Sequence, residues 1–221
     1  MKILITSGGT DVPIDDVRKI SNMSSGKYGA EIASVFFEKL HDVLYFSSKN
    51  AIKPIINHCA DTGSYNQLFF KDYESYLSNF QKKDSLPYDI IISAAAVSDY
   101  ILDKTEGKIS SDSDELVIRL KKAQKVLPLI REAAPNAFLV GFKLLVSPTP
   151  SEVETAVKKV FSNGADLVVY NDLTEIRKGN LSRFVFKPDM SFEEARDAHE
   201  LVDIILKNKN ERSDPKNSNG L

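Results

Sequence analysis

Short apolar segments alternate with segments of helical periodicity along most of the chain. The apolar segments are rich in Ile, Val and Phe, which favours strands. They lie at Lys2–Thr6, Val43–Phe46, Gln67–Phe70, Asp89–Ser93, Ala137–Gly141 and Asp166–Tyr170. Between them, apolar residues recur at helical spacing in Gly26–Leu40 and Ser151–Asn163. Because such alternation builds a parallel sheet covered on both faces, the sequence predicts an α/β fold with a Rossmann-like, doubly wound, mostly parallel sheet.

Two segments in the first half of the chain interrupt this alternation. Asp11–Ser25 is a polar connection much longer than an ordinary turn between a strand and a helix. Ile101–Asp114 reads ILDKTEGKISSDSD, and the alternating segment that follows, Glu115–Leu120, predicts a strand outside the parallel core. Since long ordered connections in compact domains are often functional, we expect the first to belong to a binding site and the second to form a flap.

The C-terminal part predicts an antiparallel addition and a last helix. Within Arg177–Asp189, the letters SRFVFKP predict one arm of an antiparallel hairpin. Ser191–Lys207 has the apolar spacing of a helix, whereas residues 208–221 lack apolar anchors and predict a disordered tail. No linker divides the chain, so we expect a single domain over residues 1–207.

Composition and charge exclude several classes of function. The chain has 42% hydrophobic residues and 29 Lys and Arg against 31 Asp and Glu, so its net charge of -2 gives no basic field for general nucleic-acid binding. Cys59 has no disulfide partner, and His41, His58 and His199 form no zinc motif with it. The N-terminus becomes glycine-rich too early for a signal peptide, and no apolar run could span a membrane. We expect a cytoplasmic protein, and we assign no role to His58 and Cys59.

A candidate ligand site begins where the first strand ends. Ser7, Gly8, Gly9 and Thr10 follow that strand directly, at the carboxyl edge of the sheet where open α/β folds bind ligands. Glycines there let backbone amides approach a phosphate group. A plain tight turn explains them equally well, because the pattern is neither a dinucleotide-binding fingerprint nor a P-loop.

Two further motifs fit the same edge. Ile20–Gly29, ISNMSSGKYG, stands ahead of a predicted helix whose N-terminus would attract an anion, although an ordinary Ser or Asn cap would look similar. At the end of the fourth strand, the small residues Ser93–Ala96 leave room for a flat ring. Asp99 could bond an exocyclic amine or a ribose, or cap a turn. Lysines are usual partners of phosphate, but any single lysine is better explained as a solvated surface residue, because most lysines are exposed.

Taken together, these segments resemble the phosphopantothenoylcysteine synthetases, the phosphopantothenate-cysteine ligases of coenzyme A biosynthesis. The motifs that carry the resemblance are ITSGGT, PIDDVRKISNMSSGKYG, AAAVSDY followed by GKI, the pair Gly141 and Phe142, and DLVVYND. The resemblance runs from Lys2 to about Asp172 and is to the stand-alone form without the flavin-dependent decarboxylase domain. It implies no FMN, a partnership with a separate decarboxylase, and a homodimer. We expect Glu115–Leu120 and Arg183–Lys187 to make the dimer contact.

The resemblance also implies a reaction in two steps. The carboxylate of 4'-phosphopantothenate attacks the α-phosphate of CTP, or of ATP, in the presence of Mg²⁺. The amine of cysteine then displaces the nucleoside monophosphate from the acyl nucleotide. Such a reaction requires no covalent enzyme nucleophile, which agrees with the lack of any Cys/His or Ser/His/Asp pattern in the sequence.

Roles follow from the resemblance residue by residue. Asn22 would hold the acyl-nucleotide intermediate and Lys108 would contact the nucleotide from the flap, so these are the two predicted catalytic residues. The predicted nucleotide-binding residues are Ser93, Ala94, Ala95, Asp99, Lys108, Lys121, Lys122, Phe142 and Lys159. The predicted phosphopantothenate-binding residues are Gly8, Gly9, Asn22, Ser24, Ser25 and Gly26. No metal site made by the protein itself is predicted.

Two other classes of function stay open. An oxidoreductase that binds NAD(P) on the same fold would need a glycine fingerprint and an acidic residue at the end of the second strand, where this sequence has Ser47 and Ser48. A non-catalytic nucleotide-binding protein would keep the pocket but would not need Asn22 and Lys108. Pyrophosphate release with the substrates present would separate the classes.

Overall fold

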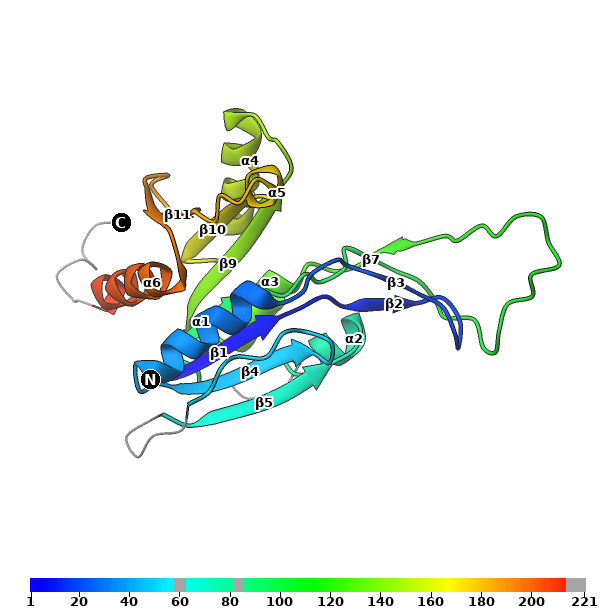
Figure 1. The fold of residues 1–221 in the computed structure, drawn as a ribbon, viewed down its shortest axis with the longest axis horizontal. Coiled ribbons are helices and arrows are strands. Elements are labelled where there is room, and N and C mark those ends of the chain that lie inside the picture. Colours follow the sequence, from blue (N-terminus) through cyan, green and yellow to red (C-terminus); the bar gives the residue numbers. More distant parts are fainter. Residues whose placement is uncertain (58–62, 82–85, 214–221) are drawn as a thin grey trace.

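The computed structural model describes residues 1–57, 63–81 and 86–213. An eight-stranded sheet forms the centre of the molecule (Figure 1). In their order across the sheet, its strands are β12 (Phe192–Ala195), β11 (Arg183–Phe186), β10 (Leu167–Asp172), β9 (Phe138–Leu145), β6 (Ile90–Ser93), β1 (Lys2–Ser7), β4 (Asp42–Ser48) and β5 (Tyr65–Phe70). Strands β10 to β5 are parallel to their neighbours, whereas β11 pairs antiparallel with both β10 and β12. This architecture confirms the predicted fold class.

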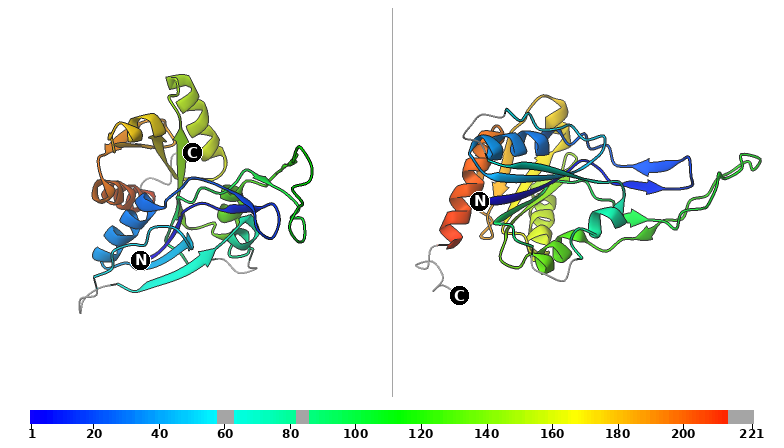
Figure 2. Two further views of the ribbon diagram at one scale, coloured as in Figure 1. Left: turned by 45° about the vertical axis from the view of Figure 1, so that its right-hand side comes forward. Right: turned by 90° about the horizontal axis from the view of Figure 1, so that it is seen from below.

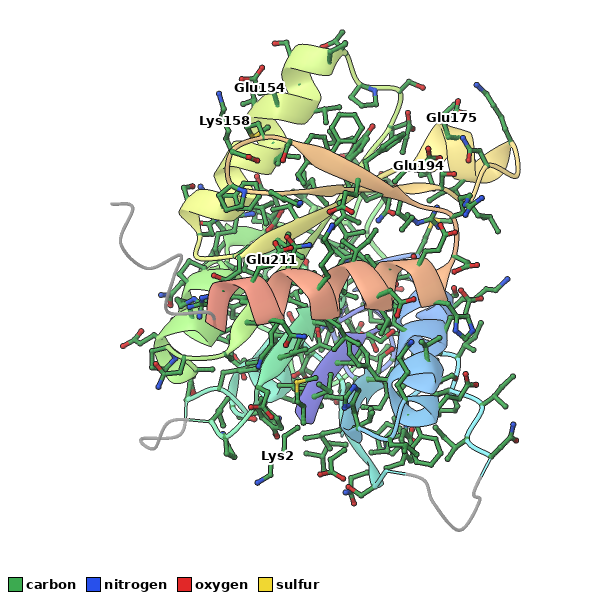
Figure 3. All side chains as sticks on the ribbon, turned by 90° about the vertical axis from the view of Figure 1, so that its left-hand side faces the viewer. Lys2, Glu154, Lys158, Glu175, Glu194 and Glu211 are labelled. Atoms are coloured by element: carbon green, nitrogen blue, oxygen red, sulfur yellow. The ribbon has the colours of Figure 1, made fainter. Side chains whose placement is uncertain are left out.

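Helices cover both faces of the sheet. They are α1 (Lys27–Glu38), α2 (Tyr73–Leu77), α3 (Val126–Ala133), α4 (Pro150–Ser162), α5 (Leu173–Arg177) and α6 (Ala198–Ser213). Side chains alternate between the faces: Ile3 and Ile5 pack with α1 and α6, whereas Leu4 packs on the opposite face with α2 and α3. Figure 3 shows α6 lying across its face of the sheet, and shows Glu154 and Lys158 on the outside of α4. None of the helices in the described ranges is both long and apolar enough to cross a membrane.

The order of the strands reverses beside β1. From β1 the chain continues to β4 and β5 on one side of the sheet, and then returns to place β6 on the other side of β1 before continuing to β9 and β10. Loops that leave the carboxyl ends of neighbouring strands diverge at such a switch point, which opens a crevice for ligands. The position of a ligand site between β1 and β6 therefore follows from the topology.

Two extensions leave the same end of the body (Figures 1 and 2). One is the antiparallel hairpin of β2 (Asp11–Pro13) and β3 (Lys19–Ser21). The other is the arm, defined here as residues 102–120, whose base is the antiparallel pair β7 (Tyr100–Ile101) and β8 (Lys121–Lys122). Residues 110–120 of the arm are all exposed. The long connection and the flap expected from the sequence are these two extensions.

The predicted strand at Glu115–Leu120 is wrong, because these residues form no strand in the described structure. Their alternating pattern is real, but the arm extends into solvent and brings no neighbouring strand beside them. The antiparallel strand expected within Arg177–Asp189 is confirmed as β11, which is paired on both of its edges. A strand that is already paired on both sides has no free edge for another chain.

The boundaries of the last helix also differ from the prediction. The helix begins at Ala198 rather than Ser191, because the preceding residues pair with β11 as β12. It continues past Lys207 to Ser213, so the disordered tail predicted from residue 208 begins too early. Its last turns are held by Arg212, whose guanidinium lies 2.7 Å from the carboxylate of Asp166. Residues 214–221, and the unassigned His58 and Cys59, lie outside the described residues.

Candidate functional site

One pocket lies at the carboxyl ends of β1, β4 and β5. This β1–β5 pocket has a volume of about 670 Å³ and is rich in hydroxyl, amide and lysine side chains. The residues that line it are Gly9, Asp11, Lys19, Ser21, Asn22, Met23, Ser24, Ser25, Ser48, Lys49, Asn50, Phe70 and Lys71. Such a lining suits an elongated polar ligand that carries negative charge.

Close packing of the loops requires glycine at two positions near this pocket. Gly26 is the N-cap of α1 with φ 71°, and a Cβ atom there would lie 2.8 Å from the Cβ atom of Ala51. At Gly9, an added Cβ atom would lie 2.9 Å from the backbone oxygen of Asn22. Gly26 has no side chain to cap α1, and the first turn of the helix has no acidic residue. The positive end of the helix dipole is therefore not offset by an N-cap side chain or by an acidic group in that turn.

Asn22 connects the loop before α1 to the loop after β6. Its Nδ2 atom donates a 2.7 Å hydrogen bond to the carbonyl oxygen of Ala96. Ala96 lies between Ala95 and Val97, both of which line a second pocket, whereas Asn22 itself lines the β1–β5 pocket. One hydrogen bond therefore joins the walls of two pockets at the switch point of the sheet.

The second pocket lies between the carboxyl ends of β6 and β9, the first turn of α3 and one side of α4. This β6–β9 pocket has a volume of about 550 Å³. The half-buried ring of Phe142 lies in its wall and also contacts Tyr28 of α1, edge to face, at 6.3 Å between ring centroids. Small residues at and after the end of β6, Ser93 and Ala95, also line this pocket. A lining that combines an aromatic residue with small side chains suits a flat heterocycle.

Charged groups in the β6–β9 pocket are only partly compensated. Asp99 accepts a 2.5 Å hydrogen bond from Lys125, and Glu152 is engaged by the N-cap of α4, Thr149. Lys143 and Lys159 also line the pocket, and neither has an ion-pair partner in the part of the chain that the structure describes. Two lysines are therefore free to meet an anion in this pocket.

The tip of the β2–β3 hairpin holds the arm on both sides of Lys108. Asp16 exchanges two hydrogen bonds with Gly107: its backbone amide donates at 3.0 Å and its carboxylate accepts at 2.9 Å. After Lys108, the carbonyl oxygen of Ile109 accepts a 2.6 Å hydrogen bond from Arg18. The peptide groups next to Lys108 are thus fixed, although its exposed side chain lines neither pocket.

Asp15 is the buried ionic centre of this contact, and its side chain has no exposed area. Burial alone would raise the pKa of Asp15. Hydrogen bonds from the side chain of Arg18 and from the amides of Val17 and Ile109 outweigh burial and hold the pKa well below its usual range. Asp15 is therefore ionised at neutral pH, and its charge helps to tie the hairpin to the arm.

Most of the residues predicted from the sequence gather in the two pockets. The β6–β9 pocket is lined by Ser93, Ala95, Asp99, Phe142 and Lys159, and the β1–β5 pocket by Gly9, Asn22, Ser24 and Ser25. Ala94 packs against the core beside them, and Gly8 and Gly26 are buried. Three predicted nucleotide lysines line neither of these two pockets: Lys108 in the arm, Lys122, and Lys121, which pairs with Asp103.

The structure adds lysines that the sequence reasoning missed. Lys49 and Lys71 follow the ends of β4 and β5, and Lys125 and Lys143 line the other pocket. The sequence contained a signal for Lys49 and Lys71, because residues that follow neighbouring parallel strands meet at one edge of the sheet. No comparable signal existed for Lys125, since its contact with Asp99 depends on the small β7–β8 pair that precedes it.

These features define a Rossmann-like α/β protein with adjoining ligand pockets at the switch point of its sheet. Residues 1–183 match the family described as the DNA/pantothenate metabolism flavoprotein C-terminal domain, and the chain belongs to this family. The coenzyme A biosynthesis bifunctional protein CoaBC of Thermococcus kodakarensis is 32% identical over 175 residues, which are 78% of this chain and 41% of the relative. The chain thus spans about two fifths of the length of that relative.

A plant ligase and a bacterial protein of known structure are also similar to this chain. Phosphopantothenate-cysteine ligase 1 of Arabidopsis thaliana is 29% identical over 221 residues, covering 77% of this chain and 69% of the relative. The crystal structure of the DNA/pantothenate metabolism flavoprotein from Streptococcus pneumoniae has a TM-score of 0.82 and 28% identity, and the match covers 96% of this chain and 99% of that one. The similarity to this structure therefore includes nearly all of both chains.

Neutralising Asp15 should weaken the fold in a pH-dependent manner. Because the pKa of Asp15 is lowered from 3.8, its ionised form stabilises the folded state above that value, and this contribution is lost as pH falls through the lowered pKa. We expect Asp15→Asn to reduce the free energy of unfolding at about pH 7, and the difference from the wild type to shrink below about pH 4. Urea unfolding followed by circular dichroism measures both values.

Glu106→Gln is the matched control, because Glu106 is an exposed carboxylate on the same arm. It should unfold like the wild type at each pH. A difference between Asp15→Asn and the wild type that stays constant with pH would contradict the assigned role of the Asp15 charge.

Proposed function

We propose that the protein is a phosphopantothenate-cysteine ligase that works through an acyl-nucleotide intermediate. The observation that carries the proposal is the 2.7 Å hydrogen bond from Asn22 to Ala96, which links two pockets suited to two anionic substrates. Membership of the family and the similarity to the Arabidopsis thaliana ligase support it. The reaction would belong to coenzyme A biosynthesis in the cytoplasm, with a separate decarboxylase acting on the product.

The two substrates would occupy different pockets. The base of the nucleotide would lie against Phe142, with Asp99 at the pocket rim and its phosphates near Lys143 and Lys159. 4'-Phosphopantothenate would occupy the β1–β5 pocket, with its carboxylate directed toward Asn22. This division brings the carboxylate and the α-phosphate together where the pockets adjoin.

The chemistry then requires positioning and charge neutralisation. A carboxylate oxygen bonds to the α-phosphorus, the bond from that phosphorus to the bridging oxygen breaks, and pyrophosphate leaves with the electron pair. The amine of cysteine next bonds to the acyl carbon and loses a proton, and the nucleoside monophosphate leaves with the electrons of its bond to that carbon. Asn22, held by Ala96, would orient the acyl group. Lys143 and Lys159 would stabilise the charge on the departing phosphates.

Mg²⁺ would enter as the complex with the triphosphate. The described ranges contain no group of three His, Cys, Asp or Glu side chains that could hold a metal ion. The nearby carboxylates of Asp99 and Glu152 are already engaged by Lys125 and Thr149. Phosphate oxygens would therefore supply the ligands of Mg²⁺, and its chemistry would be to neutralise the leaving pyrophosphate. We propose CTP as the nucleotide, with ATP as the alternative, and expect no FMN.

We propose that the active form is a homodimer in which the arm covers a second copy. Leu116 and Val117 are 48% and 73% exposed, and Ile118 and Leu120 continue the apolar stretch without a partner strand in the described structure. Exposed apolar segments of this kind are usually covered by another chain. Because β11 is paired on both edges, we assign the dimer contact to the arm and not to Arg183–Lys187. Lys108 would then act in the β6–β9 pocket of the neighbouring subunit.

The purified protein should make 4'-phosphopantothenoylcysteine from 4'-phosphopantothenate, cysteine and CTP. CMP and pyrophosphate should appear in equal amounts with the product, and chelation of Mg²⁺ should stop the reaction. Chromatography of nucleotides and a pyrophosphate assay measure these products. Release of a nucleoside diphosphate and inorganic phosphate would contradict the acyl-nucleotide route, and an absence of turnover would favour the non-catalytic alternative.

Substitutions of the two proposed catalytic residues should affect different steps. Asn22→Asp places a negative charge beside the acyl group, so the acyl nucleotide should accumulate or be lost while nucleotide binding is retained. Lys108→Gln should slow formation of the acyl nucleotide by about 10²-fold or more, because the lysine stabilises charge in the transition state. Rapid-quench measurements of the intermediate test both. Lys158→Gln, an exposed lysine on the outside of α4, is the control, and wild-type rates in either test variant would remove that residue from the mechanism.

The dimer can be tested by mixing inactive variants. Light scattering should give twice the mass of one chain. If Lys108 acts in the neighbouring subunit, exchange between Asn22→Asp and Lys108→Gln should restore about a quarter of the wild-type activity, because half of the dimers are mixed and each mixed dimer has one complete site. A monomeric mass with full activity would contradict the dimer, and mixing without recovery would contradict action across the interface.

A further inference from the structure

Two lysines of the β1–β5 pocket have no role in the mechanism described so far. Lys49 and Lys71 line this pocket next to the ends of β4 and β5. A third lysine of the lining, Lys19, lies 2.6 Å from the carboxylate of Asp11. In the described ranges neither Lys49 nor Lys71 has an ion-pair partner. The pocket therefore holds two positive charges that nothing in its lining compensates.

Backbone contacts fix the places of both lysines relative to the pocket. The carbonyl oxygen of Lys71 accepts a 2.9 Å hydrogen bond from the amide of Asp11, and its own amide donates at 2.9 Å to the side chain of Ser75. Lys49 lies in the turn Ser48–Ala51, whose end residues are joined by a 3.1 Å backbone hydrogen bond. The two charges thus come from well-held positions on two neighbouring strands.

The neutral part of the lining connects these charges to the proposed reaction centre. Asn22 lies at the side of the pocket that adjoins the β6–β9 pocket, and Ser24, Ser25 and Asn50 supply hydroxyl and amide groups along the lining. A ligand that fills this pocket therefore meets both Asn22 and the two lysines. The lining favours a molecule that carries a reacting group and a separate anion.

We infer that Lys49 and Lys71 form the binding site for the phosphate monoester of the acyl substrate. The inference rests on the proposed function, in which that substrate is 4'-phosphopantothenate. A phosphate monoester carries about -1.5 to -2 charge at neutral pH, which the two free ammonium groups balance. Lysine suits such a group because its ammonium acts as a point charge that needs no planar partner.

The phosphates of the nucleotide fit this site less well. The β6–β9 pocket has its own free lysines, Lys143 and Lys159, in the same cavity as the ring of Phe142. A nucleotide bound there reaches positive charge without crossing Asn22. Lys49 and Lys71 are therefore assigned to discrimination between phosphorylated and unphosphorylated acyl substrates.

The test is a comparison of two substrates across three variants. The wild type, Lys49→Gln, Lys71→Gln and the double variant are assayed with 4'-phosphopantothenate and with pantothenate, which lacks the phosphate. The ratio of kcat/KM for the two substrates should fall about tenfold for each single variant and about 100-fold for the double variant, because each loses a charge-assisted contact. Lys2→Gln is the control: Lys2 is an exposed lysine at the amino end of β1 and does not line the pocket, so this variant should keep the wild-type ratio.

Binding measurements keep this inference separable from the proposed function. Calorimetric titration of each variant with 4'-phosphopantothenate and with pantothenate, without nucleotide, should show the same loss of preference for the phosphorylated compound even if no ligation occurs. Preference retained by the double variant, in binding or in turnover, would overturn the inference. An equal loss of affinity for both compounds would also overturn it, since the lysines would then shape the pocket rather than recognise phosphate.

Discussion

Much of the site depends on the backbone of a single residue, Ala96, in the loop after β6. Its carbonyl oxygen accepts hydrogen bonds from the amide of Thr10 at 3.2 Å and from the side chain of Asn22 at 2.7 Å. Its amide donates to the carbonyl oxygen of Gly8 at 2.8 Å. These bonds join the loops after β1, before α1 and after β6 at the point where the strand order reverses. These bonds hold Asn22, which lines the β1–β5 pocket, against the loop whose neighbouring residues line the β6–β9 pocket.

The charged groups of the pockets and of the extensions are arranged differently. Within residues 1–57, 63–81 and 86–213, each pocket keeps two lysines free of ion pairs, whereas the hairpin and the arm use their charges on each other, with Asp15 and Asp16 bonded to the arm. The hairpin strand β3 leads directly into Asn22, so the hairpin that contacts the arm is continuous in sequence with the residue that joins the pockets.

The sequence could predict the sheet because its central strands are buried on both faces and read as continuous apolar runs. It failed at Glu115–Leu120, since an alternating pattern shows what a strand needs and not whether a neighbour is present. The position of Asn22 and the small residues at Ser93–Ala95 could be found through their family motif. Lys49 and Lys71 could not be distinguished from solvated lysines, because their shared pocket exists only after β4 and β5 have paired.

A crystal structure grown with 4'-phosphopantothenate, CTP and Mg²⁺, without cysteine, tests the central claim most directly, because the acyl nucleotide has no second substrate to consume it. We expect the phosphate monoester between Lys49 and Lys71, the acyl phosphate at Asn22, and the cytosine against Phe142. An intermediate confined to one pocket, or one with its nucleotide in the β1–β5 pocket, would contradict it.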